Sequence, residues 1–172
     1  MASLMENLIV ILEKECNEYQ NLLELSEAKT PVIVSGNLEE LARITDEEQL
    51  VVSRINKIEI SRQEVFADIA NVVNKDVKTL LLTDLIEMLS KRPEEQQKLA
   101  KVHDSLRTVV RAVKRVNDQN RELIKNALEL VQFNLNMLQS MKAAPETANY
   151  NRGAYSTGMQ MGIDQVGFDA KQ

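Results

Sequence analysis

Apolar residues recur every three or four positions through residues 93–141, with no proline or glycine after Pro93. The recurring residues are Leu99, Val102, Leu106, Val109, Val113, Val116, Leu123, Ala127, Leu130, Met137 and Met141. This spacing matches a heptad repeat, which keeps one stripe of a long helix facing its neighbours. At a rise of about 1.5 Å per residue the pattern predicts a helix of roughly 70 Å, whose apolar stripe other helices must cover.

Two further helices are predicted in the first half of the chain, over residues 2–29 and 38–74, each with an apolar face at helical spacing. The faces comprise Leu4, Leu8, Ile11, Leu12, Tyr19, Leu22 and Leu25 in the first helix, and Leu38, Leu41, Ile44, Val51, Ile55, Ile58, Val65, Ile69 and Val72 in the second. Asn37, with Glu40 three residues later, forms a capping-box-like start for the second helix. Joined as an αα-hairpin, the two helices are expected to cover the long stripe as far as Leu130.

Two breaks separate the predicted helices. Pro31 lacks a backbone donor and Gly36 can adopt a positive φ, so the apolar segment around them is predicted to be a loop packed against the bundle. After the second helix, Thr83 and Asp84 provide an N-cap for a short apolar helix over residues 83–90. We expect this helix to close one end of the bundle.

The composition supports a helical class. There is no tryptophan, aromatic residues make up 3 % of the chain, and only 5 glycines and 3 prolines are present. A β-sandwich or barrel needs more turn residues and more alternating aromatic or β-branched residues than this chain has. The sequence therefore predicts an all-α fold, an antiparallel bundle of long coiled-coil-like helices over residues 1–141, in which the long helix occupies 93–141.

The last part of the chain differs from the bundle. Four of the five glycines follow residue 152, so residues 142–172 are predicted to form a flexible tail. Its apolar residues stand two to five positions apart, as in segments that fold on binding, and methionine is common on adaptable binding surfaces. They are Tyr150, Tyr155, Met159, Met161, Ile163, Val166 and Phe168. The same pattern suits a chain end that docks on its own bundle, and the composition leaves both interpretations open.

Charge is distributed unevenly along the chain. The net charge of −5 argues against a nucleic-acid-binding protein. Residues 1–70 are acidic, whereas the middle of the long helix is basic through Lys98, Lys101, Arg107, Arg111, Lys114, Arg115, Arg121 and Lys125. One interpretation is that opposite charges set the register of packed helices; the other is a basic patch that meets an acidic partner.

Catalytic chemistry is not indicated. The chain has one histidine, His103, and one cysteine, Cys16, with no glycine-rich phosphate loop and no Glu-x-x-His pair. We therefore expect no catalytic residue, no cofactor and no metal site. A single cysteine suits a reducing cytoplasm, and the absence of a long apolar run and of a basic amino-terminal region argues against membrane insertion and a signal peptide.

Asparagine occurs where the apolar stripe predicts leucine or valine. Asn120 lies on the stripe, and Asn134 repeats this two heptads later. A polar residue on such a seam lowers stability but can define the register by requiring a hydrogen-bonding partner. Alternatively, these positions mark a part of the helix that faces a partner. We favour the register hypothesis for Asn120 and the partner hypothesis near Met137 and Met141.

The order and spacing of several short stretches resemble the FlgN-type flagellar export chaperones across nearly the whole chain. The stretches are SGNLEEL at 35–41, EEQL at 47–50, EISR at 59–62, VNDQNRELI at 116–124 and YNRG at 150–153. The resemblance implies a cytoplasmic bacterial protein that binds hook-associated proteins of the flagellum before secretion. It also implies that the protein prevents their premature assembly and presents them to the type III export machinery.

The resemblance places client contact at the end of the long helix and in the tail, and implicates a tyrosine there in docking to the export gate. Tyr150 and Tyr155 are the candidates for that tyrosine. We expect the partner-binding residues to be Met137, Met141, Tyr150, Tyr155, Met159, Met161, Ile163, Val166 and Phe168. The alternative function is a coiled-coil scaffold or adaptor that self-associates through residues 93–141.

Overall fold

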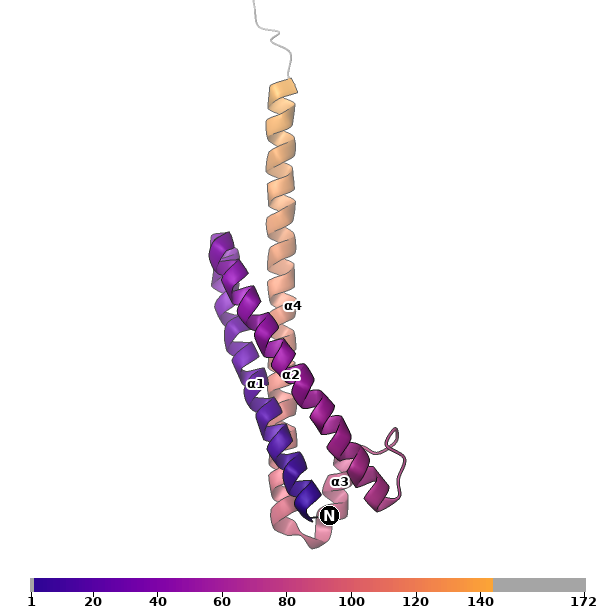
Figure 1. Cartoon of the computed structure of the whole chain (residues 1–172). Coiled ribbons are helices and arrows are strands. Elements are labelled where there is room, and N and C mark those ends of the chain that lie inside the picture. Colours follow the sequence, from indigo (N-terminus) through magenta and orange to yellow (C-terminus); the bar gives the residue numbers. More distant parts are fainter. Residues whose placement is uncertain (1, 144–172) are drawn as a thin grey trace, which may run out of the picture. The chain divides into compact units, whose positions relative to one another are not determined.

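A computed structural model describes residues 2–143, with the side chains of residues 3–142. All regular elements in this range are helical, so the predicted all-α class is confirmed for it (Figure 1). They are α1 (Ala2–Ser35), α2 (Leu38–Val73), α3 (Leu82–Met88), the 3-10 turn η1 (Leu89–Lys91) and α4 (Pro93–Ala143). By its internal contacts the chain divides into two units, Met1–Leu130 and Val131–Gln172.

Helix α1 is longer than predicted. It continues through Pro31 to Ser35, so the expected loop after residue 29 is wrong. Pro31 is exposed and lacks only its own backbone donor, whereas Ile33 two residues later is 7 % exposed. Burial of Ile33 and of its half-buried neighbour Val32 offsets the hydrogen bond that proline removes, and the helix persists.

The turn between α1 and α2 consists of Gly36 and Asn37. The Gly36 N–H donates to the Ile33 carbonyl (3.2 Å) and the Asn37 N–H donates to the Val32 carbonyl (3.3 Å), which is a Schellman motif. Gly36 has a φ of 70°, where a side chain would be strained. The Asn37 side-chain oxygen accepts from the Glu40 N–H (3.1 Å), so the predicted N-cap of α2 is confirmed.

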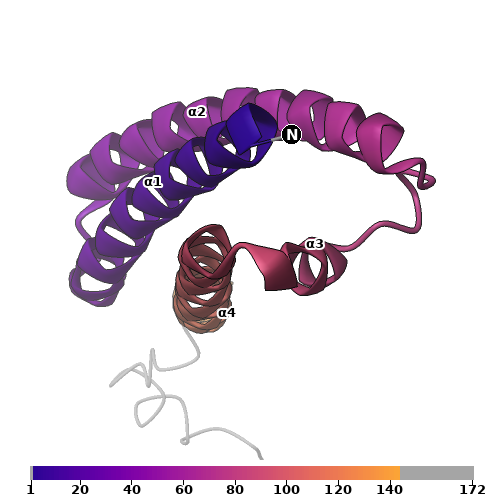
Figure 2. The ribbon, with the colours of Figure 1, turned by 90° about the horizontal axis from the view of Figure 1, so that it is seen from below.

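The larger apolar core gathers the start of α1, the end of α2, α3 with η1, and the start of α4. Figure 2 shows α3 and α4 across from the pair formed by α1 and α2. The buried side chains of this core include Met5, Leu8, Leu12, Val65, Ile69, Leu80, Leu85, Leu89, Leu99 and Val102. Because Leu85 and Leu89 are part of it, the α3 segment closes this end of the first unit as expected.

The start of α3 also differs from the prediction. The helix begins at Leu82, with Leu81 rather than Thr83 at the N-cap position. Leu81 has no capping side chain, but its N–H donates to the Asp84 carboxylate (2.9 Å), which occupies the third helical position. The acidic residue was therefore correctly associated with the helix start, although the expected cap was two residues too late.

A second apolar cluster lies further along the helices. Leu22 of α1, Val51 and Ile55 of α2, and Val113 of α4 are buried in it. Helices α1 and α2 approach each other most closely, and α4 reaches the pair through its side chains. Since Leu99 packs near the start of α1 and Val113 packs further along it, α4 runs parallel to α1 and antiparallel to α2.

Asn120 sits in a polar layer that joins the three long helices. It is 4 % exposed, its amide N–H donates to the Ser26 carbonyl (2.8 Å), and its oxygen accepts from the Thr30 hydroxyl (2.7 Å). The Ser26 hydroxyl donates to Glu48 of α2 (3.0 Å), which also pairs with Lys29 (2.8 Å). Asn120 thus has the hydrogen-bonding partners that the register hypothesis requires.

We expect Asn120→Ala to lower the free energy of unfolding by about 1–3 kcal/mol, because two hydrogen bonds each worth about 0.5–1.5 kcal/mol are lost. Asn117→Ala is the matched control, since Asn117 is exposed on the same helix, and should cost less than about 0.5 kcal/mol. Urea denaturation followed by circular dichroism measures both. Equal costs would show that the polar layer does not hold α4 on the hairpin.

Candidate binding surface

The apolar stripe of α4 becomes exposed soon after Asn120. Leu123 and Ile124 are half-buried, and all residues from 125 to 142 are exposed. The expectation that the hairpin covers the stripe as far as Leu130 is therefore wrong, since Leu130 is 61 % exposed. Asn120 lies opposite the Ser26 and Thr30 region, and α1 ends at Ser35. At about 1.5 Å per residue, the hairpin can cover only one to two further turns of α4.

Large apolar side chains continue along this exposed part of α4. They form what we call the α4 apolar surface, which comprises Leu128, Leu130, Val131, Phe133, Leu135, Met137, Leu138 and Met141. Each is between 48 % (Leu135) and 65 % (Leu128, Met141) exposed. A soluble protein rarely leaves so many neighbouring apolar side chains in water unless the surface binds something.

The α4 apolar surface has two adjacent rows. At 3.6 residues per turn, Leu128, Val131, Leu135 and Leu138 lie in one row and Leu130, Met137 and Met141 in the next, with Phe133 at the edge. The opposite side of the same turns carries Glu129, Gln132, Asn136 and Ser140, and Gln132 donates to Asn136 (2.9 Å). The apolar sector is thus wider than the narrow seam of a two-stranded coiled coil, and suits the face of a partner helix.

Two of the predicted partner-binding residues belong to this surface. Met137 is 52 % exposed and Met141 is 65 % exposed, which is consistent with contact to a partner. The others, from Tyr150 to Phe168, lie outside the described residues. The row of Leu128, Val131, Leu135 and Leu138 was not predicted from the spacing. Its signal was a broadening of the apolar stripe after residue 127.

The single cysteine, Cys16, and the single histidine, His103, do not form a reactive site. Burial and the neighbouring Glu15 charge raise the pKa of the Cys16 thiol, which keeps it protonated and unreactive at neutral pH. The Nδ1 atom of His103 lies 3.2 Å from the carboxylate of its neighbour Asp104. Within residues 2–143, no group of three or more histidine, cysteine or acidic side chains could hold a metal ion.

The buried carboxylate of Glu15 belongs to the interface of α1 and α2. It is 4 % exposed, and burial raises its pKa, although the guanidinium of Arg62 at 3.2 Å acts in the opposite direction. Arg62 also pairs with Glu59 on its own helix. Removal of Arg62 would leave a buried charge without a partner, so this ion pair contributes to the packing of the hairpin rather than to a reaction.

A family comparison identifies the chain. The family model described as "FlgN protein" matches residues 1–157, which include the whole described region and the α4 apolar surface. The chain belongs to the FlgN family. The predicted family is thus confirmed, and all five stretches that carried the resemblance fall within the matched residues.

A similar individual protein gives less information about function than the family does. "Uncharacterized protein YvyG" from Bacillus subtilis (strain 168) is 26 % identical over 140 residues, which cover 81 % of this chain and 81 % of that protein. No solved structure matches this FlgN-family chain significantly.

Membership of the FlgN family gives the chain a general role as a flagellar export chaperone, in a family that is not enzymatic and binds hook-associated proteins. The exposed α4 apolar surface agrees with such a role. Among the described residues, none of the helices combines the length and the apolar character needed to span a bilayer.

Proposed function

We propose that this chain binds flagellar hook-associated proteins in the cytoplasm, prevents their premature assembly and delivers them to the export apparatus. The observation that carries the proposal is the α4 apolar surface, exposed within the region that matches the FlgN family. Export-gate components are then further partners, through Tyr150 or Tyr155.

The geometry of the α4 apolar surface suits an amphipathic client helix. Residues 128–141 extend over roughly 20 Å of α4, which is enough for three to four turns of a partner helix. Two rows of leucine, valine and methionine at helical spacing offer the anchors that helix-in-groove recognition uses. Met137 and Met141 can change rotamer to fit different clients at little cost.

Release is as important to an export chaperone as binding. A segment that becomes ordered on binding loses part of the interaction energy to ordering, which keeps the affinity moderate. The spaced apolar residues of the tail, from Tyr150 to Phe168, suit such a contribution. We propose that they extend the surface that begins at Met137 and Met141.

The role of the tail is tested by comparing the full chain with a variant that ends at Ala143. We expect the shorter chain to bind a purified hook-associated protein about tenfold more weakly by isothermal titration calorimetry, which is a difference of about 1.4 kcal/mol. Its circular dichroism should show an intact helical bundle. Equal affinities would remove the tail from the client site and leave the α4 apolar surface as the whole site.

The α4 apolar surface also keeps the scaffold hypothesis open, because a second copy of the same helix would fit an exposed helical stripe. Sedimentation velocity separates the two functions. If the chain is a client chaperone, it should bind the hook-associated protein whether it is itself a monomer or an oligomer. A tight dimer that does not bind this client would instead support the scaffold.

A further inference from the structure

A basic face occupies α4 upstream of the α4 apolar surface. Arg107, Arg111, Lys114 and Arg115 are all exposed, and we call them the α4 basic face. At 100° per residue they lie within about a quarter to a third of the helix circumference. Their sector is opposite to the one that carries Val109, Val113 and Val116, which is buried against the hairpin. The basic side chains therefore point away from α1 and α2.

The acidic residues of the hairpin do not neutralise this face. Three ion pairs connect α1 with α2: Lys29–Glu48, Glu18–Arg54 and Glu15–Arg62. Within the described residues, no ion pair joins the α4 cations to either helix of the hairpin. The α4 basic face therefore does not set the register of α4 through ion pairs with the hairpin. Asn120 and the apolar clusters position the helix instead.

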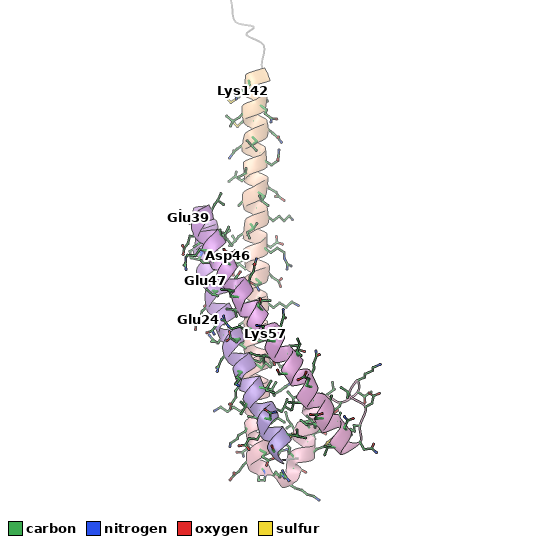
Figure 3. The ribbon with its side chains drawn as sticks, in the orientation of Figure 1. Glu24, Glu39, Asp46, Glu47, Lys57 and Lys142 are labelled. Atoms are coloured by element: carbon green, nitrogen blue, oxygen red, sulfur yellow. The ribbon has the colours of Figure 1, made fainter. Side chains whose placement is uncertain are left out.

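Acidic side chains are nevertheless abundant on the hairpin. Figure 3 labels Glu24 of α1 and Glu39, Asp46 and Glu47 of α2, which all lie on the hairpin. By contrast, Arg107, Arg111 and Arg115 follow one another at intervals of four residues on α4. Like charges at this spacing destabilise a helix by about 0.2–0.5 kcal/mol per pair. Asp104 and Asp118 flank the series on the same side of α4, but they pair with His103 and Arg121, and no ion pair of Arg107, Arg111 or Arg115 is present in the described part of the chain.

We propose that the α4 basic face docks an acidic helical segment of a partner protein. Arg107, Arg111 and Lys114 stand at positions i, i+4 and i+7, so glutamates with the same spacing on a partner helix can pair with them. The face is straight and one helix wide. It also lies on a different stretch of α4 from the α4 apolar surface, so both surfaces can be occupied together.

Other anionic partners fit less well. Asp104 and Asp118 share the sector of Arg111, seven residues before and seven after it, and would repel a continuous phosphate backbone. An acidic helix can avoid this repulsion by carrying uncharged residues opposite the two aspartates. A membrane surface is disfavoured because basic membrane-binding helices carry bulky apolar residues on the side that enters the lipid, whereas the α4 stripe in this stretch is buried against the hairpin.

The probe for this proposal is a synthetic alanine-rich helical peptide with glutamates at i, i+4 and i+7, labelled for fluorescence anisotropy. A peptide with glutamine at these positions is its control. The test variant of the full chain is Arg107→Gln/Arg111→Gln/Lys114→Gln. The matched variant, Lys57→Gln/Lys75→Gln/Lys78→Gln, removes the same charge from exposed lysines of α2 and the loop that follows it.

We expect the glutamate peptide to bind the unmodified chain, to bind less tightly as salt is raised, and to lose at least about tenfold affinity with the test variant. The matched variant should change the affinity less than twofold, and neither variant should alter binding of a hook-associated protein.

Four outcomes would overturn the proposal. The first is an equal loss of affinity in the test and matched variants, and the second is equal binding of the glutamine and glutamate peptides. The third is tighter binding of duplex DNA, or of vesicles with 30 % anionic lipid, than of the glutamate peptide. The fourth is self-association of the chain that only the test variant abolishes.

Discussion

Replacement of Leu135 and Leu138 by aspartate is expected to weaken the binding of a hook-associated protein by about 100-fold or more. Both side chains belong to the same row of the α4 apolar surface and are 48 % and 55 % exposed. Burial of a leucine against a partner contributes about 1.5–3 kcal/mol, and about 1.4 kcal/mol corresponds to a factor of ten in affinity. The new carboxylates would also lose hydration at the interface. Isothermal titration calorimetry with the purified client measures the loss.

The matched control adds the same charge to the other side of the same turns. Gln132→Asp/Asn136→Asp changes two exposed polar residues opposite the apolar rows, and should alter the affinity less than about threefold. Circular dichroism and thermal unfolding should be nearly unchanged in both double variants, since none of the four side chains is buried. Similar losses in the two variants would mean that net charge, rather than the α4 apolar surface, governs client binding.

Leu85→Ala is expected to lower the free energy of unfolding by about 2–5 kcal/mol. Leu85 is 0 % exposed and lies in the larger core with residues from the start of α1, the end of α2 and the start of α4. Truncation to alanine removes its apolar contacts and leaves a cavity in this shared core. Urea denaturation monitored by circular dichroism gives the difference from the unmodified chain.

Leu81→Ala provides the control for Leu85→Ala. Leu81 precedes the same short helix and is 61 % exposed, so its truncation should cost less than about 1 kcal/mol. A small cost for both variants would show that α3 is an accessory to the bundle and not part of its core. A large cost for Leu85→Ala alone would confirm that the α3 segment closes this end of the first unit.

The contrast between Pro31 and Asn37 shows what local sequence can and cannot predict. The capping function of Asn37 was predictable because it depends on one side chain and a backbone N–H three residues away. Whether the helix continues through Pro31 depends on the burial of Ile33, to which residues distant in the sequence contribute. Local propensity predicted a loop, and tertiary packing extended the helix instead.

The candidate site shows the same division. The spacing along α4 indicated that Met137 and Met141 share a helical stripe with Leu99 and Val113, and nothing in that spacing distinguishes a covered position from an exposed one. Exposure depends on the length of the hairpin, whose tip at Gly36 limits the cover of α4. The row of Leu128, Val131, Leu135 and Leu138 was missed because the expected stripe was kept as narrow as a heptad seam beyond residue 127.

The sequence by itself determined the helical class, the approximate extent of the long helix, the polar position Asn120 and the FlgN family, because periodicity and short stretches are local properties of the chain. Only the tertiary structure decided which parts of α4 are covered, that Asn120 bonds to Ser26 and Thr30, and that the α4 basic face points away from the acidic hairpin. These outcomes depend on contacts between residues some ninety positions apart, and helical spacing alone does not specify which partner a face will meet.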